Sequence, residues 1–168
     1  MTDTFLEPSG VVGPFEGVRA ATADDVPFMI GLASAHAEAI AEDRGAELLL
    51  RHGMPSLRSA ERLAGLVAAD DAVVVIGTFD EVPFGYAAAR FEPLDDGGLL
   101  AVIDDLLVDA EARKLGIGET MMNEVVASAK AAGCLGVDAV ALPGDRNTKN
   151  FFESFGLKAR LLVVHHRF

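Results

Sequence analysis

Three strand-like segments follow one another in the middle of the chain, and they constrain the fold more than any other feature of the sequence. The segment 72–79 is rich in β-branched residues, and a short acidic turn leads from it into the segment 82–91. A second turn at 95–98 leads into a third apolar segment, 99–108. Because consecutive strands joined by short turns pair antiparallel, this part of the chain predicts a β-meander.

Helices and single strands are predicted on both sides of the meander. A strand followed by a helix and then a further strand requires parallel neighbours, so we expect an α/β fold of the mixed type. Its central mixed sheet would join the antiparallel meander to parallel βαβ units, with helices on both faces. The flanking elements are a strand at 18–22, helical segments at 26–33, 35–50 and 57–69, a helix at 116–132, a strand at 137–142, a helix at 146–155 and a last strand at 161–164.

The length and composition favour one folded domain. The chain has 168 residues, of which 51% are apolar, and this is enough to bury a substantial core. Residues 1–17 contain several prolines and glycines and no sustained periodicity. We therefore predict an N-terminal arm at 1–17 and a single domain at 18–168.

The charge of the chain excludes several classes of partner. There are 26 acidic and 14 basic side chains, which gives a formal net charge of −12. A protein that binds nucleic acid along its backbone needs an excess of Lys and Arg, so we expect no nucleic-acid partner. We also expect no membrane partner, because the longest uncharged segments are far shorter than the roughly 18–20 residues of a membrane span. The first ten residues lack the basic and apolar regions of a secretory signal, so a cytoplasmic location is expected.

Metal binding is not expected from the histidines and the cysteine. The single cysteine, Cys134, excludes an internal disulfide and a cysteine-based zinc site. His165 and His166 end the last predicted strand without a matching group of ligands. His36 and His52 lie in the early helical region and are typical of surface or hydrogen-bonded histidines.

A glycine-containing turn follows the meander and opens a helix. It reads Arg113-Lys114-Leu115-Gly116-Ile117-Gly118-Glu119. Glycines at alternate positions allow backbone N–H groups to converge at a helix N-terminus, where free donors and the helix dipole attract an anion. Arg113 and Lys114 add positive charge there, which suits a diphosphate. An ordinary turn with a solvated Arg-Lys pair is the alternative.

Two common phosphate-binding motifs do not fit this turn. A dinucleotide-binding turn needs a third glycine where the chain has Met121, and it follows the first strand of an alternating fold. A Walker-type loop needs Gly-Lys-Ser/Thr, which is absent here. The remaining pattern is Arg-x-x-Gly-x-Gly after a paired strand.

This pattern resembles the acyl-CoA-binding motif of the GNAT superfamily of N-acetyltransferases. The segment 103–118 carries the main resemblance, and the segment 151–157 is similar to the aromatic helix end of that family. The start at 18–25 and the order of elements are also similar, so the resemblance covers the chain from Val18 to the C-terminus. It implies transfer of an acetyl group from acetyl-CoA, bound without a metal, to an amine of a small molecule or peptide. It also implies a homodimer.

The resemblance assigns the CoA contacts to two segments. Backbone groups of Leu107 and Val108 would meet the pantetheine arm, and the amides of 113–118 would hold the diphosphate. Arg146 and Lys149 are expected near the remaining phosphate charge, or else on a solvated helix face. The expected CoA-binding residues are Leu107, Val108, Arg113, Lys114, Leu115, Gly116, Ile117, Gly118, Glu119, Asn147, Lys149, Asn150 and Phe152.

Two adjacent carboxylates are the candidate catalytic residues. A protonated amine cannot attack a thioester, so the site needs a group that removes a proton. Asp104 and Asp105 lie on the third strand of the meander, where alternation predicts that they point to opposite faces. Each is a candidate base, a candidate amine anchor or a structural residue.

The chain departs from the GNAT pattern at Phe152. Many members have a tyrosine there that can protonate the leaving thiolate, whereas the only tyrosine of this chain is Tyr86, in the second meander strand. A non-catalytic acyl-CoA-binding module is therefore the alternative function, and a nucleotide-binding interaction domain is a third. The surplus of negative charge would favour a cationic amine if part of it lines the acceptor site.

Overall fold

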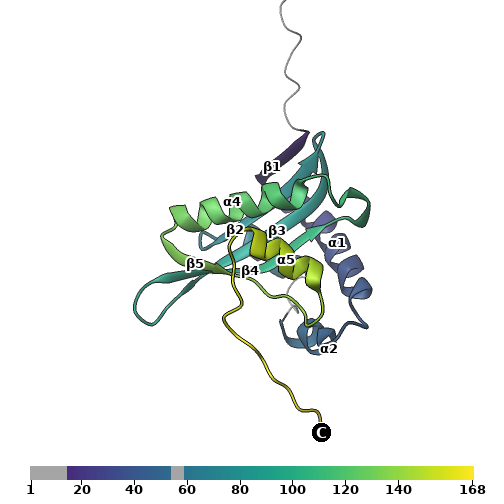
Figure 1. Cartoon of the computed structure of the whole chain (residues 1–168). Coiled ribbons are helices and arrows are strands. Elements are labelled where there is room, and N and C mark those ends of the chain that lie inside the picture. Colours follow the sequence, from purple (N-terminus) through teal and green to yellow (C-terminus); the bar gives the residue numbers. More distant parts are fainter. Residues whose placement is uncertain (1–14, 54–58) are drawn as a thin grey trace, which may run out of the picture.

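The computed structural model describes residues 15–53 and 59–168, and it contains one five-stranded mixed sheet (Figure 1). The spatial order of the strands is the same as their order in the chain. The first four pair antiparallel and the last is parallel to the fourth, as expected. The strands are β1 (Glu16–Ala20), β2 (Ala72–Phe79), β3 (Val82–Pro93), β4 (Leu99–Val108) and β5 (Cys134–Asp138).

Helices cover both faces of this sheet, which confirms the predicted fold class. α1 and α3 pack on one face, and α4 and α5 on the other. No helix in the described ranges is long and apolar enough to cross a membrane. The helices are α1 (Val26–Ala39), α2 (Ala46–Leu48), α3 (Ala60–Val67), α4 (Ile117–Ala131) and α5 (Arg146–Ser154), with 3-10 turns at Ala23–Asp25 and Ala110–Ala112 and a π turn at Leu49–Gly53.

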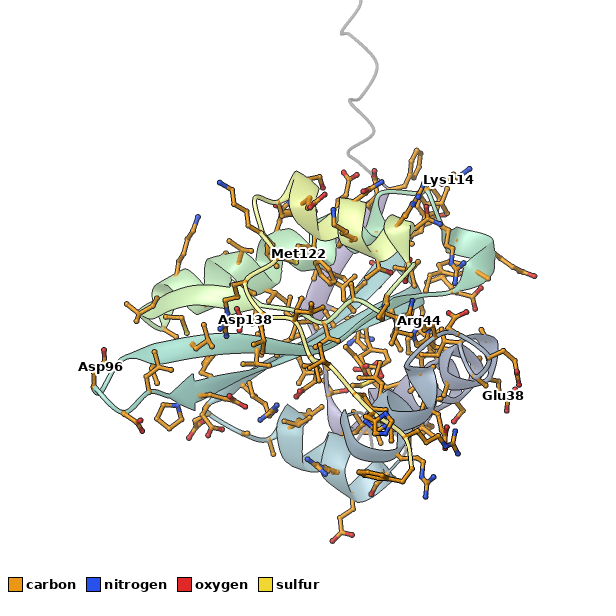
Figure 2. All side chains as sticks on the ribbon, turned by 60° about the horizontal axis from the view of Figure 1, so that its bottom comes forward. Glu38, Arg44, Asp96, Lys114, Met122 and Asp138 are labelled. Carbon is orange, nitrogen blue, oxygen red and sulfur yellow. The ribbon has the colours of Figure 1, made fainter. Side chains whose placement is uncertain are left out.

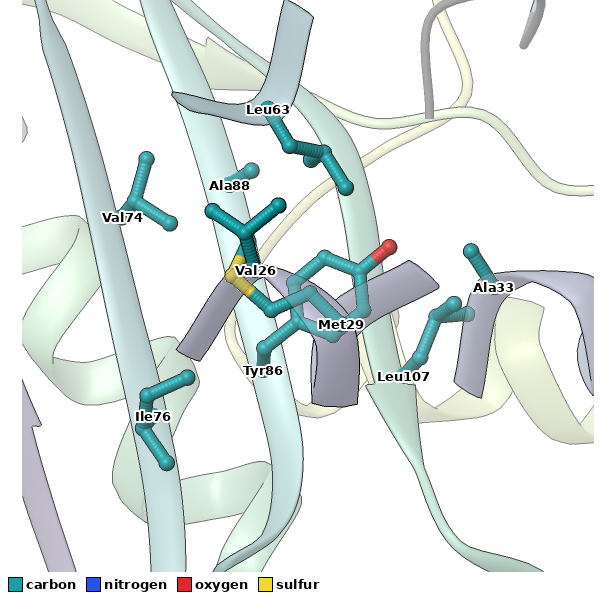
Figure 3. Packing of buried hydrophobic residues seen from close by; sticks show 9 residues of the cluster. All are labelled: Val26, Met29, Ala33, Leu63, Val74, Ile76, Tyr86, Ala88 and Leu107. Carbon is teal, nitrogen blue, oxygen red and sulfur yellow. The ribbon is translucent and has the colours of Figure 1, made fainter. Parts of the chain in front are cut away.

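Each face of the sheet has its own hydrophobic cluster. On the α1 face, Met29 and Leu63 pack around the ring of Tyr86 (Figure 3). On the α4 face, Met121 and its helical neighbours pack on β2, β3 and β4, and Met122 is also fully buried (Figure 2). α4 lies so close to β2 that a Cβ at Gly77 would be 2.5 Å from Ile117 Cγ2.

A β-bulge interrupts the pairing of β4 with β3. Ala88 pairs with Asp105 and the next residue of β3, Ala89, pairs with Ile103, so Asp104 is an extra residue without a partner. An extra residue reverses the faces to which the two halves of a strand present their side chains. Ile103 accordingly packs on the α4 face and Leu107 on the α1 face.

Several predicted boundaries are wrong. α1 continues to Ala39, so the predicted second helical segment at 35–50 does not exist as one helix. β5 begins directly after the turn that ends α4, three residues before the predicted strand at 137–142. β1 begins at Glu16, inside the predicted arm; residues 1–14 and the predicted helix break at 54–56 lie outside the described part of the chain.

The last predicted strand, at 161–164, is not formed. The chain after Gly156 has no regular structure. Leu157 still packs against the α4-face cluster and Arg160 pairs with Asp138, and the chain then runs away from the body of the molecule (Figure 1). Leu161, Leu162, Val163 and Val164 are 74–85% exposed. The apolar, β-branched composition of this segment predicts a strand, but a strand needs a neighbour to pair with, and none lies beside it here.

Candidate active site

The sheet opens between β4 and β5. The pairing of these two strands ends at Val102 and Asp138, where β5 stops. From Ile103 to Val108 the outer edge of β4 has no strand partner. Unpaired backbone donors and acceptors of this kind bind an extended ligand readily, because they would otherwise need water.

The glycine turn lies at the end of this open edge and leads into α4. Thr120 makes the first backbone bond of the helix, to the Gly116 carbonyl at 3.0 Å. The amides of Ile117, Gly118 and Glu119 have no hydrogen-bond partner among the described residues. Three amides without partners at the start of a 15-residue helix are the kind of arrangement that attracts an anion, because the helix dipole adds to their partial charges.

Positive backbone φ angles shape this turn. Lys114 has a φ of 76° and Gly116, the N-cap of α4, has a φ of 80°. The second value suits glycine, which adopts this conformation without strain. A Cβ at Gly116 would also lie 2.8 Å from Oε1 of Glu16, but this is the end of a flexible side chain, so the positive φ is what favours glycine here.

Gly118 contacts both the open edge of β4 and α5. A Cβ at this position would be 3.6 Å from Val108 Cγ2 and 3.6 Å from Phe151 Cε2. These are ordinary van der Waals distances. Phe151, which the sequence analysis did not single out, thus packs beside the start of α4, while the predicted contact residue Phe152 is half-buried against the cluster on the α4 face.

The predicted cationic and amide side chains are exposed. Arg113 and Lys114 make no ion pair with another described residue, so their charge is available at the glycine turn (Figure 2). Lys149 is different, because its Nζ lies 2.6 Å from Glu153 Oε1 on the same helix. Arg146 is the first residue of α5, and Asn147, Lys149 and Asn150 also lie exposed on this helix.

Asp105 is the buried carboxylate of the open stretch of β4. It is 3% exposed, and its Oδ2 accepts a hydrogen bond of 2.5 Å from the Tyr86 hydroxyl. Its Oδ1 is buried and has no partner among the described residues. Burial raises the pKa of Asp105 to about 7, although the Tyr86 hydrogen bond opposes this rise, and the charge of Asp104 adds to it.

Asp104 is an ion-pair residue rather than a second free carboxylate. Its Oδ2 and Oδ1 lie 2.5 Å and 2.7 Å from Nε and Nη2 of Arg90, and Arg90 also pairs with Glu92. Arg90 shares a face of β3 with Ala88, the residue opposite Asp105. Both carboxylates therefore lie on the α1 face, and the prediction that they point to opposite faces is wrong because of the bulge.

His36 on α1 lies near the same end of the sheet. Burial and then the charge of Arg113 lower its pKa, while Asp145 and Asp43 act in the opposite direction. These effects indicate that α1, the glycine turn and the start of α5 come together there. No group of three or more His, Cys, Asp and Glu side chains in residues 15–53 and 59–168 is arranged to hold a metal ion.

Sequence reasoning missed Tyr86, Arg90 and Phe151. Tyr86 and Arg90 lie on β3 and bind carboxylates of the neighbouring strand β4. Tyr86 is 19 residues from Asp105 in the sequence, and Arg90 is 14 residues from Asp104. The only signal for Tyr86 was that a tyrosine interrupts a run of small residues in a buried strand. Phe151 precedes the aromatic position that the resemblance singled out, and only the packing of α5 on α4 distinguishes the two.

Comparisons with known proteins agree with this geometry. The sequence profile described as the Acetyltransferase (GNAT) family matches residues 38–157. No curated protein sequence matches the chain significantly.

Solved structures share the fold at low sequence identity. A mutant of the BH1408 protein from Bacillus halodurans has a TM-score of 0.77 and 22% identity, and the match covers 90% of this chain and 99% of that one. An aminoglycoside acetyltransferase from an uncultured soil metagenomic sample, in complex with sisomicin, has a TM-score of 0.67 and 20% identity over 92% and 95%. Glucosamine-6-phosphate N-acetyltransferase from Arabidopsis thaliana has a TM-score of 0.66 and 17% identity over 91% and 98%. With its profile match over most of the chain, its mixed sheet and its open β4 edge, the protein belongs to the GNAT family of acetyltransferases.

Proposed function

We propose that the protein is an acetyl-CoA-dependent N-acetyltransferase that acts on a primary amine of a small molecule or peptide. One observation carries the proposal. The unpaired edge of β4, the free amides at the start of α4 and a buried carboxylate with one free oxygen lie along one continuous stretch of chain. An extended anionic co-substrate and a proton-accepting group are what acetyl transfer to an amine requires.

The described residues fit acetyl-CoA. The amides of Ile117, Gly118 and Glu119 and the charges of Arg113 and Lys114 would hold the diphosphate. The outer edge of Leu107 and Val108 would bind the pantetheine amides by strand-like hydrogen bonds. When bound, acetyl-CoA supplies the activated thioester. Lys149 is a weaker candidate for a phosphate contact than Arg113 or Lys114, because its Nζ pairs with Glu153.

Asp105 is the base that we propose, in preference to Asp104. A base must be free to accept a proton at the working pH, and Arg90 engages both oxygens of Asp104. Asp105 has a free Oδ1, and its pKa of about 7 suits a group that takes up and releases a proton near neutral pH. Overall, one ammonium ion and one thioester give one amide, one thiol and one proton.

We propose a cationic acceptor. The formal charge of −12 leaves a large acidic surplus, while Arg113 and Lys114 concentrate positive charge at the proposed diphosphate site. Such a field favours cationic substrates by steering them to the protein. Two structural neighbours are named for acetyl transfer to an aminoglycoside and to glucosamine-6-phosphate, which supports a small amine-bearing acceptor.

Phe152 favours a second candidate, a non-catalytic acyl-CoA-binding module. Its side chain has no proton to give to a leaving thiolate, and it packs against the hydrophobic cluster on the α4 face. The ionisable pair of Tyr86 and Asp105 is the observation that favours the enzyme over this alternative.

The glycine turn gives a test of cofactor binding. Gly118→Glu places a negative charge among the free amides, so we expect CoA to lose its stabilising effect in a thermal shift assay. Gly65→Glu is the matched control, because Gly65 on α3 is exposed and has no atom within 4 Å of an added Cβ. Gly118→Ala, for which there is room, should keep the shift.

Thiol release with a panel of amines, aminoglycosides and peptides then separates the candidates. Turnover with a cationic amine supports the transferase. A CoA-induced shift without turnover on any acceptor supports the binding module, and no shift with acetyl-CoA or CoA contradicts both. Stabilisation by adenine dinucleotides but not by CoA would instead favour the nucleotide-binding domain.

A further inference from the structure

The two oxygens of the Asp105 carboxyl group have different surroundings. Oδ2 accepts the 2.5 Å hydrogen bond from Tyr86, whereas Oδ1 is buried and has no partner in the described part of the chain. Tyr86 is fully buried on β3, so its hydroxyl is held in place by the ring. Among the side chains drawn in Figure 3, only that of Tyr86 contains an oxygen atom.

We propose that Tyr86 is a positioning residue for the acetyl transfer. Its hydroxyl fixes the orientation of the Asp105 carboxyl and leaves Oδ1 as the one oxygen that receives the proton of the acceptor ammonium group. In this step the N–H bond of the ammonium breaks, an O–H bond forms at Oδ1, and the neutral amine keeps the electron pair. This inference rests on the proposed function.

The apolar surroundings strengthen the effect of this hydrogen bond on the ionisation of Asp105. α1 and α3 present Met29, Val26 and Leu63 to the ring of Tyr86, and none of these can donate a hydrogen bond. In a medium without water, a single donor strongly stabilises the ionised form of a carboxyl group. A phenylalanine would fill the same space, so the packing alone does not call for the hydroxyl.

The other charges near Asp105 are few. Asp104 on the same strand is the one acidic group that acts on its ionisation, and it disfavours the charged form. Arg90 on β3 neutralises Asp104 through two hydrogen bonds. The Tyr86 hydroxyl is thus the favourable contact of the ionised Asp105 carboxylate.

Tyr86→Phe tests the proposal. Without the hydroxyl the pKa of Asp105 rises further, so the acid-side limb of kcat/KM should move to higher pH by about one unit, a tenfold loss at pH 6. The CoA-induced thermal shift should remain close to that of the unsubstituted protein. If Tyr86 had only a structural role, Tyr86→Phe would lower the stability of the protein and leave the pH dependence of kcat/KM unchanged.

A second experiment keeps the hydroxyl and changes the ring only by two fluorine atoms. The chain has one tyrosine, so biosynthetic 3,5-difluorotyrosine labels residue 86 alone. Fluorine makes the phenol a stronger donor, and the acid-side limb should then move to lower pH, opposite to the effect of Tyr86→Phe. Equal profiles for the fluorinated and ordinary proteins would overturn the proposal.

A measurement without substrate separates this inference from the proposed function. Titration of the aspartate carboxyl carbons by NMR, assigned with Asp105→Asn, follows Asp105 in the ligand-free protein. A titration of Asp105 that does not change in Tyr86→Phe overturns the role of Tyr86 even if acetyl transfer is found. A changed titration in a protein without transferase activity overturns the proposed function and, with it, the catalytic meaning of the pair.

Discussion

At the level of single residues, two aspartates have pKa values that are shifted in opposite directions. Asp25, at the start of α1, is held by Arg19 through bonds of 2.6 and 2.8 Å, and this hydrogen bonding lowers its pKa to about 2. Asp105 lies among apolar side chains, and burial raises its pKa to about 7. One carboxyl group therefore makes folding more favourable as pH rises, and the other less favourable.

The difference in stability between Asp105→Asn and the unsubstituted protein should show that the Asp105 carboxyl group makes folding less favourable as pH rises. Between pH 4 and pH 7 the folded protein keeps a proton on Asp105 that the unfolded chain has released. The contribution of Asp105 to the free energy of unfolding therefore falls as pH rises, by about 2 to 4 kcal/mol across that window. Urea denaturation at several pH values measures the difference.

Asp25→Asn is the control with the opposite sign. Its lowered pKa means that the contribution of Asp25 is present above pH 4 and is lost as pH falls toward 2. A difference curve for Asp105→Asn that is flat from pH 4 to 8 would contradict the buried, raised pKa.

At the level of elements, the packing of α4 on β2 depends on one glycine. In Gly77→Ala the new Cβ would lie 2.5 Å from Ile117 Cγ2 and 2.7 Å from Met121 Sδ, so these side chains or the helix that carries them must shift. We expect a loss of about 1 to 3 kcal/mol in the free energy of unfolding, measured by urea denaturation. Gly136→Ala on β5, with no atom within 4 Å of its added Cβ, should change it far less. Equal losses in both variants would show that α4 does not pack this tightly.

The predictability of each strand depended on what defines its ends. β2 and β4 have the predicted bounds, because turn residues limit both apolar segments on either side. β5 ends at Asp138 because its partner β4 diverges there. The apolar residues after Asp138 predict a longer strand, but they do not indicate where the pairing with β4 ends. The bulge at Asp104 could not be predicted from the sequence. Both faces of β4 carry apolar residues, so no change in the alternation of apolar and polar residues marks the extra residue.

The candidate site was predictable to the extent that its residues are consecutive in the chain. The glycine turn and the carboxylates of β4 lie within 16 residues, 103–118, and the pattern indicated them directly. The roles of the two aspartates depend on Tyr86 and Arg90, which reach them from another strand. Spacing along one chain segment carries no information about such contacts.

At the level of the whole molecule, the C-terminal segment 161–168 is exposed and has no regular structure. Its residues 161–164 are apolar, and Arg167 contacts the body only through an exposed pair with Glu47, at 3.1 Å. Apolar segments with free backbone groups tend to associate with one another.

Truncation after Arg160 tests this reading of the segment. We expect the thermal midpoint to change by less than about 2 °C, because little buried area is lost. Light scattering at increasing concentration should show less self-association than for the full chain. Leu162→Glu with Val164→Glu serves as a control that keeps the length. A large fall in the thermal midpoint would show that the segment belongs to the core.

The bulge of β4 also has a genetic meaning. Ile103 and Asp105 pair with Ala89 and Ala88, which are neighbours on β3, so the pairing passes over residue 104. Loss of the codon for residue 104 would make Ile103 and Asp105 neighbours in a regular strand, on the α4 and α1 faces that they already occupy. A deletion of this one codon therefore keeps the strand pairing in register and removes the carboxylate that pairs with Arg90, whereas a deletion of a paired residue of β4 shifts the register.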